Sequence, residues 1–349
     1  MEDNFENTTE QNENVNFESR LNLQPLQENV QKVKAEIGKV IVGQSKMIDQ
    51  LLVAVLSNGH VLLEGVPGVA KTISAKLLAK TLSLDFSRIQ FTPDLMPSDI
   101  IGTSIFDLSK STFEFKKGPI FSNFVLIDEI NRAPAKTQAA LFEVMEERQI
   151  TADGTTYILE KPFLVIATQN PIEQEGTYRL PEAQLDRFLF KITIDYPNLE
   201  EEIHIIQKEN ELQSRNKMDT IATIISQSNI IEFQELVKQV LIEPNLIEYI
   251  AKIVLNTREN AFLYLGASPR ASIAILNASK GFAALRGRDF VTPDDIKEAA
   301  IPVLQHRVLV TPEREMEGIT STEICRNSEI NTYVLIQTND SIFQTTLPQ

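Results

Sequence analysis

Residues 60–78 join a short apolar run to a glycine-rich loop and then to a helical pattern, and this succession constrains the fold more than any other part of the chain. The apolar run at 60–63 predicts a buried strand, and the pattern at 72–82 predicts a helix. A loop between such elements can turn its backbone N–H groups towards a polyphosphate, while the helix N-terminus adds a partial positive charge. The sequence therefore predicts a phosphate site. The alternative is a glycine–proline turn followed by a surface lysine.

The predicted phosphate site has the spacing of a P-loop, with one departure. We expect Lys71 to reach the β- and γ-phosphates of a nucleotide and the hydroxyl of Thr72 to ligate Mg²⁺. Ala70 stands where the strict pattern G-x-x-x-x-G-K-[ST] has its last glycine. We expect Ala70 to keep a negative φ at the start of the helix, where a methyl group is tolerated. The residues expected to bind the phosphates are Gly65, Val66, Pro67, Gly68, Val69, Ala70, Lys71 and Thr72.

Two acids follow a second apolar run further along the chain. Residues 124–127 are all apolar and lead directly into Asp128 and Glu129. The carboxyl ends of buried strands are where open α/β sheets bind their ligands. We expect Asp128 to hold Mg²⁺ through its water shell and Glu129 to polarise the water that attacks the γ-phosphate. The alternative is an ordinary strand followed by a helix-capping acid.

The order of the elements predicts an α/β core and a helical second domain. Apolar runs at 60–63, 124–127 and 163–167 alternate with helical patterns, which is typical of a parallel sheet covered on both faces. Two hairpins interrupt this order. One joins 104–106 to 113–115, and the other joins 149–152 to 156–159 around an Asp-Gly turn. After Pro197 the patterns are mostly helical.

Charge and composition narrow the class of protein further. The net charge is −15, and residues 1–29 hold seven of the acids against one arginine, so we expect a disordered acidic leader there. The acidic balance disfavours nucleic acid as the main partner. Cys325 is the only cysteine, which excludes an intrachain disulfide. The polar start and the lack of a bilayer-length apolar run predict a cytoplasmic protein without membrane insertion.

Several segments together resemble the MoxR-type AAA+ ATPases. The stretch from Asp128 to Arg148 (DEINRAPAKTQAALFEVMEER) is similar to the signature of this family, and the resemblance extends over about residues 35–315. It includes the alanine at position 70. The other matching segments are IVGQ at 41–44, FTPDLMPSDIIG at 91–102, GPIF at 118–121, ATQNP at 167–171, GTYRLPEAQLDRF at 176–188 and SPR at 268–270.

The resemblance implies a fold and further site residues. The fold is a P-loop NTPase (AAA+) core, a parallel sheet between helices, with a C-terminal helical lid domain. Asn170 resembles sensor 1, which would orient the attacking water beside Glu129. Arg187 resembles the arginine finger that reaches the γ-phosphate of a neighbouring subunit, and Arg270 resembles sensor 2, which would touch phosphate from the lid. Val42 and Gly43 correspond to a stretch that packs near adenine.

Each of these predicted roles has a simpler structural alternative. Asn170 can be a turn residue before Pro171, Arg187 a surface ion pair and Arg270 a solvated residue at a helix start. In this family hairpins like those at 104–115 and 149–159 face the pore of the ring and act on a client. Phe113 and Phe115 fit that role, but aromatic residues on a hairpin more often pack. The three histidines are too scattered for a readable metal site, so we expect them to be structural or exposed.

The resemblance implies a Mg²⁺-dependent ATPase that forms a homo-oligomeric ring, commonly a hexamer, and remodels or matures protein complexes. It also implies a partner with a von Willebrand factor A domain. A DNA-translocating AAA+ motor and a nucleotide-gated assembly scaffold without useful turnover are the alternatives.

The expected organisation has four parts. After the leader at 1–29 come the nucleotide-binding core at 30–195, the lid at 196–315 and a divergent tail at 316–349. The tail departs from the family pattern, since the end of the chain from Cys325 is polar and poor in charge. A natural tail and a shifted reading frame would both produce it, so we assign it no function and leave the packing of the last lid helix open.

Overall fold

The computed structural model describes residues 20–66, 68–170, 178, 180–212 and 217–326. Its centre is a five-stranded sheet in the order β2-β5-β8-β1-β9, and every paired strand in it is parallel. The α/β fold with a parallel sheet and a helical lid, expected from the sequence, is confirmed. The sheet strands are β1 (His60–Gly65), β2 (Phe86–Gln90), β5 (Phe124–Asp128), β8 (Leu164–Gln169) and β9 (Phe188–Ile194).

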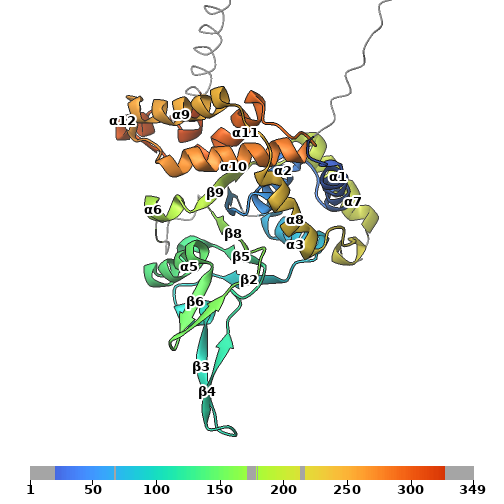
Figure 1. Ribbon diagram of the computed structural model, residues 1–349, viewed down its shortest axis with the longest axis vertical. Helices are drawn as coiled ribbons and strands as arrows, with labels where there is room; N and C mark the ends of the chain where they lie inside the picture. The colour runs from blue at the N-terminus through green and yellow to red at the C-terminus, as the bar shows by residue number, and fades with distance from the viewer. Residues whose placement is uncertain (1–19, 67, 171–177, 179, 213–216, 327–349) are drawn as a thin grey trace, which may run out of the picture.

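Helices cover both faces of the sheet (Figure 1). Val61 and Leu63 of β1 belong to the apolar core formed with the three N-terminal helices, whereas Leu62 between them belongs to the core formed with α5. Alternate residues of a strand point to opposite faces, so both faces of β1 are buried and its sequence is apolar throughout. The helices are α1 (Gln24–Gly38), α2 (Ser45–Leu56) and α3 (Lys71–Thr81) on one face, and α5 (Ala135–Glu147) on the other.

Both hairpins predicted from the sequence are present and lie together. Strands β3 (Gly102–Asp107) and β4 (Thr112–Lys117) form a hairpin that projects away from the lid, and β6 (Gln149–Ala152) and β7 (Thr155–Ile158) form the second (Figure 1). Phe115 stacks on Tyr157 at 4.8 Å between ring centroids and so joins the two hairpins. Phe113 is 75% exposed at the tip of the first hairpin. Phe115 is therefore a packing residue, whereas Phe113 contacts Phe106 of the same hairpin at 5.1 Å between ring centroids and stays largely exposed.

Most of the remaining chain is helical. Short helices α4 (Pro97–Ile101), α6 (Glu182–Leu185) and the 3-10 turns Ile130–Arg132 and Lys217–Thr220 connect the larger elements. Helix α7 (Leu199–Leu212) follows the sheet, and the lid contains α8 (Gln227–Lys238), α9 (Pro244–Glu259), α10 (Pro269–Leu285), α11 (Pro293–Leu304) and α12 (Pro312–Met316), with a small ladder of β10 (Leu263–Leu265) and β11 (Leu309–Val310). In the described part of the chain, none of the helices is both long and apolar enough to cross a membrane.

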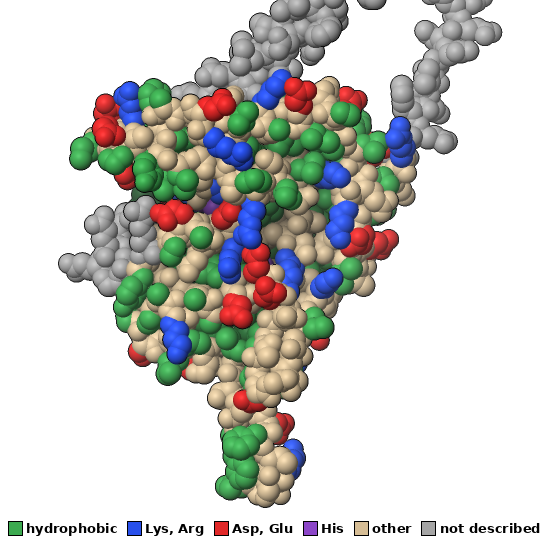
Figure 2. Space-filling view, turned by 60° about the vertical axis from the view of Figure 1, so that its left-hand side comes forward, with side chains coloured by type: hydrophobic (Ala, Val, Ile, Leu, Met, Phe, Trp, Pro, Cys, Tyr) green, Lys and Arg blue, Asp and Glu red, His purple; other side chains and the backbone are tan. Residues whose placement is uncertain are grey.

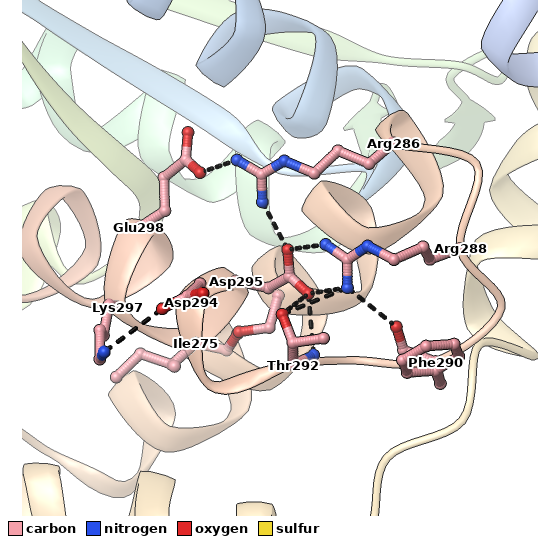
Figure 3. A network of polar contacts seen from close by, with 10 residues as sticks. Ile275, Arg286, Arg288, Phe290, Thr292, Asp294, Asp295, Lys297 and Glu298 are labelled. Carbon is pink, nitrogen blue, oxygen red and sulfur yellow. Dashed lines mark hydrogen bonds and ion pairs between the residues drawn. The ribbon is translucent and has the colours of Figure 1, made fainter. Parts of the chain in front are cut away.

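A buried carboxylate joins helices α10 and α11 of the lid. Asp295 is fully buried at the start of α11 and accepts hydrogen bonds from Arg288 at 2.7 and 2.8 Å and from Arg286 at 2.5 Å (Figure 3). It also accepts the backbone N–H of Thr292 at 2.9 Å, which forms the capping box that begins α11. Burial acts to raise the pKa of Asp295, but the hydrogen bonds from Arg288 and Thr292 outweigh it and hold this pKa below its usual value.

The boundaries expected for the leader and the tail need correction. Helix α1 begins at Gln24, and Leu26 is buried in register with Val30, so residues 24–29 belong to the folded core. At the other end, residues 321–326 are helical and Cys325 is buried in the main apolar core. Residues 320–323 (TSTE) form a capping box there, with hydrogen bonds in both directions at 2.9 and 3.3 Å. Residues 1–19 of the predicted leader and 327–349 of the predicted tail lie outside the described residues.

Candidate nucleotide site

The predicted phosphate loop lies at the carboxyl edge of the sheet. Strand β1 ends at Gly65 and α3 begins at Lys71, so the loop connects a central strand to a helix N-terminus as expected. Gly68 has a φ of +89°, and a Cβ added there would meet nothing within 4 Å. The backbone of this glycine is therefore open on its outer side, as a loop that encloses a ligand requires. Pro67 lies outside the described residues.

Ala70 does not have the negative φ that we expected. Its φ is +60° and its ψ is +17°, which is the left-handed region, and it forms the N-cap of α3. The loop has to reverse direction before the helix, and the usual glycine at this position makes that turn without a Cβ penalty. The chain therefore adopts the conformation of the usual glycine while carrying a methyl group.

Lys71 and Thr72 take different directions from the first turn of α3. The ammonium group of Lys71 donates a hydrogen bond to the carbonyl oxygen of Gly65, 2.5 Å away, so the lysine lies along the loop. The hydroxyl of Thr72 donates to Oδ1 of Asp128 at 3.5 Å. The phosphate loop and the acidic strand end, 56 residues apart, therefore meet at one point.

Asp128 is a buried carboxylate with three polar partners. Its Oδ1 accepts from Thr72 and from the hydroxyl of Thr168 at 3.2 Å, and its Oδ2 pairs with Nε of Arg88 at 2.6 Å. Arg88 comes from β2 and Thr168 from β8, the two strands that flank β5. Arg88 belongs to no motif, and Thr168, although it lies in the matching segment at 167–171, was not assigned a role from the sequence.

Glu129 sits immediately after the strand in a strained backbone conformation. Its φ is +57°, and its backbone N–H donates to the hydroxyl of Thr168 at 3.0 Å. Oε2 of Glu129 accepts from the side-chain amide of Gln90 at 2.8 Å and lies 3.0 Å from Nε of Arg132. Left-handed backbone at a non-glycine residue is concentrated at functional sites. Gln90 was also missed by the sequence analysis.

Asn170 is buried and directly follows β8. Strand β8 lies between β5 and β1 in the sheet, and Gln169 pairs with Glu64, the residue before Gly65. The carboxyl ends of β5, β8 and β1 therefore bring Asn170 to the same edge as Asp128, Glu129 and the phosphate loop.

Arg187 lies at the opposite edge of the sheet from these residues. It precedes Phe188, which pairs with His60 at the start of β1, while Ile194 pairs with Gly65 at its end. The six residues of β1 span about 17 Å at about 3.3 Å per residue. The guanidinium of Arg187 donates to the carbonyl oxygen of Phe142 and lies 3.7 Å from Oε2 of Glu146.

Arg270 shares a partner with Arg187. It lies at the start of α10 in the lid, and its Nη2 pairs with the other carboxylate oxygen of Glu146 at 3.3 Å. The residue before Glu146 is Met145, whose carbonyl oxygen contacts His60 at the start of β1. Arg187 and Arg270 therefore come from two domains and gather at the edge of the sheet remote from the phosphate loop of their own chain.

A buried ion pair fixes the lid beside Arg187. Nε of Arg307, three residues after the end of α11, pairs with Oδ1 of Asp186 at 2.7 Å, and the hydroxyl of Ser268 donates to Oδ2 of Asp186 at 3.1 Å. The side chain of Arg307 is almost completely buried. A charge pair this deep is costly to break, because either partner alone would remain buried and uncompensated. The link between 186 and 307 could not be read from the sequence.

Gly43 lines a cavity of about 420 Å³ between the core and the lid. The cavity walls include the end of β9 beside Gly65, the start of α7 and the end of α11. Gly43 has a φ of +77°, which strains residues that carry a Cβ, and a Cβ there would lie 2.4 Å from the carboxyl group of Glu201 as it is now placed. Val42, the other residue expected near adenine, is not part of this lining.

The donor set at the edge fits a nucleotide with its magnesium ion. A threonine hydroxyl and a carboxylate oxygen in contact are the hard oxygen ligands that Mg²⁺ prefers, and Thr72 and Asp128 supply them. Lys71 and the first turn of α3 supply positive charge for phosphate. The cavity beside Gly43, at the end of β9, has a volume of about 420 Å³, enough for a nucleoside.

His60 and His306 are structural, as expected. Nδ1 of His60 accepts the N–H of Val165 at 2.9 Å while Nε2 contacts the carbonyl oxygen of Met145 at 3.2 Å. Burial lowers the pKa of His60 to about 3, with a smaller contribution from the charge of Arg148. His204 is exposed, and the described residues contain no cluster of metal-ligating side chains.

A phosphate loop on a parallel α/β sheet with a helical lid defines a nucleoside triphosphatase of the AAA class. The model of the family described as "ATPase family associated with various cellular activities (AAA)" matches residues 60–190, and the AAA lid domain model matches residues 255–328. The lid match extends past residue 315, in agreement with the packing of residues 321–326.

Comparison with similar proteins identifies the family within the AAA class. The chain is 45% identical to the chaperone MoxR1 of Mycobacterium tuberculosis over 87% of this chain and 81% of that protein. It is 46% identical to the uncharacterized protein YeaC of Bacillus subtilis over 84% of this chain and 91% of that protein. A crystal structure of a candidate ATPase from Cytophaga hutchinsonii superposes with a TM-score of 0.81 at 46% identity, covering 88% of this chain and 94% of that one. The chain belongs to the MoxR family of AAA ATPases and is an ATP-binding ATP hydrolase.

Proposed function

We propose that this ATPase hydrolyses Mg²⁺-ATP at sites shared between neighbouring subunits of a homo-oligomeric ring. Lys71 and the loop from Gly65 to Thr72 bind the phosphates, and Thr72 and Asp128 hold the metal. Glu129 accepts the proton of the attacking water, and Asn170 orients that water. When bound, Mg²⁺ would supply positive charge next to the phosphates.

The observation that carries the proposal is the position of Arg187. A phosphoryl-transfer site gains greatly from an arginine that stabilises the charge of the transition state. Arg187 lies about 17 Å along β1 from the phosphate loop of its own chain. A second subunit that presents this edge would complete the site.

Arg270 belongs to the same surface in this account. Because it pairs with Glu146 beside Arg187, it would also act on the nucleotide of the neighbour rather than on that of its own chain. A single carboxylate then holds both arginines while no neighbour is present. This differs from a lid arginine that closes on its own nucleotide.

The energy of ATP hydrolysis is proposed to drive chaperone-like remodelling or maturation of protein complexes. The support is the name of the relative MoxR1, a chaperone, at 45% identity. The first hairpin adds a second argument, since it projects from the body and carries a group of exposed apolar side chains at its tip (Figure 2), namely Ile105, Phe106, Leu108 and Phe113. Such a tip can bind unfolded or exposed apolar segments of a client. We also propose a protein partner with a von Willebrand factor A domain, because the resemblance to the MoxR family implies one.

A steady-state phosphate-release assay tests the assignment of the base. The variant Glu129→Gln keeps the size and hydrogen bonds of the side chain but cannot accept a proton. It should bind ATP with the affinity of the wild type and lose about 10²-fold or more in turnover. Undiminished turnover would remove Glu129 from the mechanism. Stimulation of the wild type by DNA that declines with salt would favour a DNA-translocating motor instead.

A further inference from the structure

Glu146 pairs with two arginines that come from different domains. Its Oε2 lies 3.7 Å from Nε of Arg187, just before β9, and its Oε1 lies 3.3 Å from Nη2 of Arg270, at the start of α10. Each oxygen of this carboxylate therefore holds one guanidinium group. The side chain of Glu146 is 41% exposed. Ion pairs that are this exposed contribute little to stability, so the arginines can exchange this partner for another anion.

The backbone around both arginines is held more firmly than their side chains. Asp186, the residue before Arg187, forms the buried ion pair with Arg307. It also accepts a hydrogen bond at 3.1 Å from the hydroxyl of Ser268, two residues before Arg270. The start of α10 and the segment before β9 are thus joined through Asp186. The two guanidinium groups can change partner by side-chain rotation, without separation of the lid from the core.

The hollow in front of Arg187 is acidic. It lies between α5 and α6 (Figure 1), has a volume of about 310 Å³ and is lined by Glu143, Glu146 and Glu147. Among the described residues, neither Glu143 nor Glu147 forms an ion pair with an arginine, so the hold on the arginines belongs to Glu146.

A phosphate and α5 compete for the same donors of Arg187. Its Nη1 donates to the carbonyl oxygen of Phe142, and its Nε faces Glu146. Arginine binds phosphate through the same forked N–H groups. A phosphate of a neighbouring subunit therefore gains the full fork of Arg187 only when Glu146 gives it up.

We propose that Glu146 is a positioning residue that withholds Arg187 and Arg270 from a neighbour's nucleotide until a γ-phosphate replaces it. This regulation rests on the shared-site function proposed above. A terminal phosphate carries more negative charge than a carboxylate, so the γ-phosphate of ATP displaces Glu146. ADP ends one phosphate earlier and leaves the arginines on Glu146. The carboxylate thereby increases the difference between ATP and ADP at the shared site.

Removing the charge of Glu146 should reduce this difference. The experiment uses a Glu129→Gln background, in which ATP persists, and sedimentation velocity to find the protein concentration that gives half-maximal assembly. We expect Glu146→Gln to lower this concentration about threefold to tenfold with ADP, and less than about twofold with ATP. Glu147→Gln is the matched control, because it removes the same charge from the same hollow without contact to either arginine. An equal effect of Glu147→Gln would overturn the proposal.

Product inhibition supplies a second measurement, which also applies if the ring stays assembled with either nucleotide. In chains with native Glu129, Glu146→Gln should lower the inhibition constant of ADP about threefold to tenfold and change KM for ATP less than about twofold. The effect should decline at high salt, because exposed charges are screened. A purely structural role would change the thermal stability and not the ratio of the two constants. An unchanged ratio would contradict the proposal.

A double-mutant cycle tests whether Glu146 acts through both arginines. In an Arg270→Ala chain, Glu146→Gln should have a smaller effect on ADP inhibition than in the native chain, because one of the two guanidinium groups is missing. An effect of full size in that chain would contradict the shared hold.

The outcomes separate this regulation from the shared-site function. A wild-type chain that hydrolyses ATP as a monomer, without need of Arg187, would contradict both proposals. A chain that requires Arg187, but in which Glu146→Gln behaves like the Glu147→Gln control, would contradict this regulation alone.

Discussion

The side-chain amide of Gln90 donates a hydrogen bond to the carboxylate of Glu129, 2.8 Å away, across the gap between β2 and β5. A hydrogen bond of this length fixes the direction in which the carboxylate points. The same oxygen of Glu129 also lies near Arg132. The residue proposed as the base is therefore restrained in this conformation.

Removing the amide should release this restraint. We expect Gln90→Leu to raise basal ATP turnover about twofold to tenfold, with little change in KM, because the carboxylate of Glu129 is then free to turn towards the attacking water. In a Glu129→Gln background the same substitution should have no effect on turnover. A fall in turnover on replacing Gln90 would mean that the amide orients Glu129 for catalysis instead.

Ala70 offers a test of the loop conformation. Because its φ is +60°, Ala70→Gly should remove a Cβ penalty and stabilise the folded chain by up to about 1 kcal/mol. Ala70→Val should destabilise it, since a β-branched residue is poorly tolerated there. Urea unfolding measures both. If Ala70→Gly destabilised the protein, the residue would have the negative φ that the sequence first suggested.

The lid network predicts unequal effects of two neighbouring acids. Asp295→Ala removes the buried partner of Arg286 and Arg288 and should reduce the free energy of unfolding by about 3 kcal/mol. Asp294→Ala is the matched control: Asp294 is 83% exposed and pairs with Lys297 at 3.3 Å, so about 0.5 kcal/mol or less is expected. Equal losses would show that the network does not hold α10 and α11 together.

The pKa of Asp295 also gives this network a pH dependence. A carboxyl whose pKa is lower in the folded state contributes stability above its unfolded pKa of about 3.9, and that contribution is lost as the pH falls through the folded value. The difference in stability between the wild type and Asp295→Ala should therefore shrink below about pH 4. A difference that stayed constant down to pH 2 would contradict this assignment.

His60 should lower the free energy of unfolding at a less acidic pH than Asp295 does. Its pKa is about 3 in the folded state against about 6.5 in an unfolded chain, so the unfolded state binds the extra proton between these values. Stability should then fall by about 1.4 kcal/mol for each pH unit below about 6.5 on account of this residue. His60→Gln should lack this component between pH 6 and 5, whatever its stability at pH 7. An unchanged slope would show that His60 is not buried in its neutral form.

Continuous motifs could be read from the sequence, and contacts between distant segments could not. The loop at 65–72 and the acids at 128–129 are each one stretch with a local physical meaning, so their elements were predicted correctly. Arg88 and Gln90 gain their roles only because β2 lies next to β5 in the sheet. The pairing of Asp186 with Arg307 joins residues 121 positions apart. The left-handed φ of Ala70 was missed because alanine gives no signal for that conformation.

The most direct test of the shared site is a mixing experiment with two inactive subunits. Arg187→Ala keeps a complete phosphate loop but lacks the finger, whereas Glu129→Gln keeps Arg187 but lacks the base. If Arg187 acts on the neighbour, mixed assemblies contain sites with an intact loop, base and finger. The account predicts that the phosphate-release rate of the mixture rises well above that of either variant alone. A mixture that hydrolyses ATP no faster than the average of the two variants would contradict it.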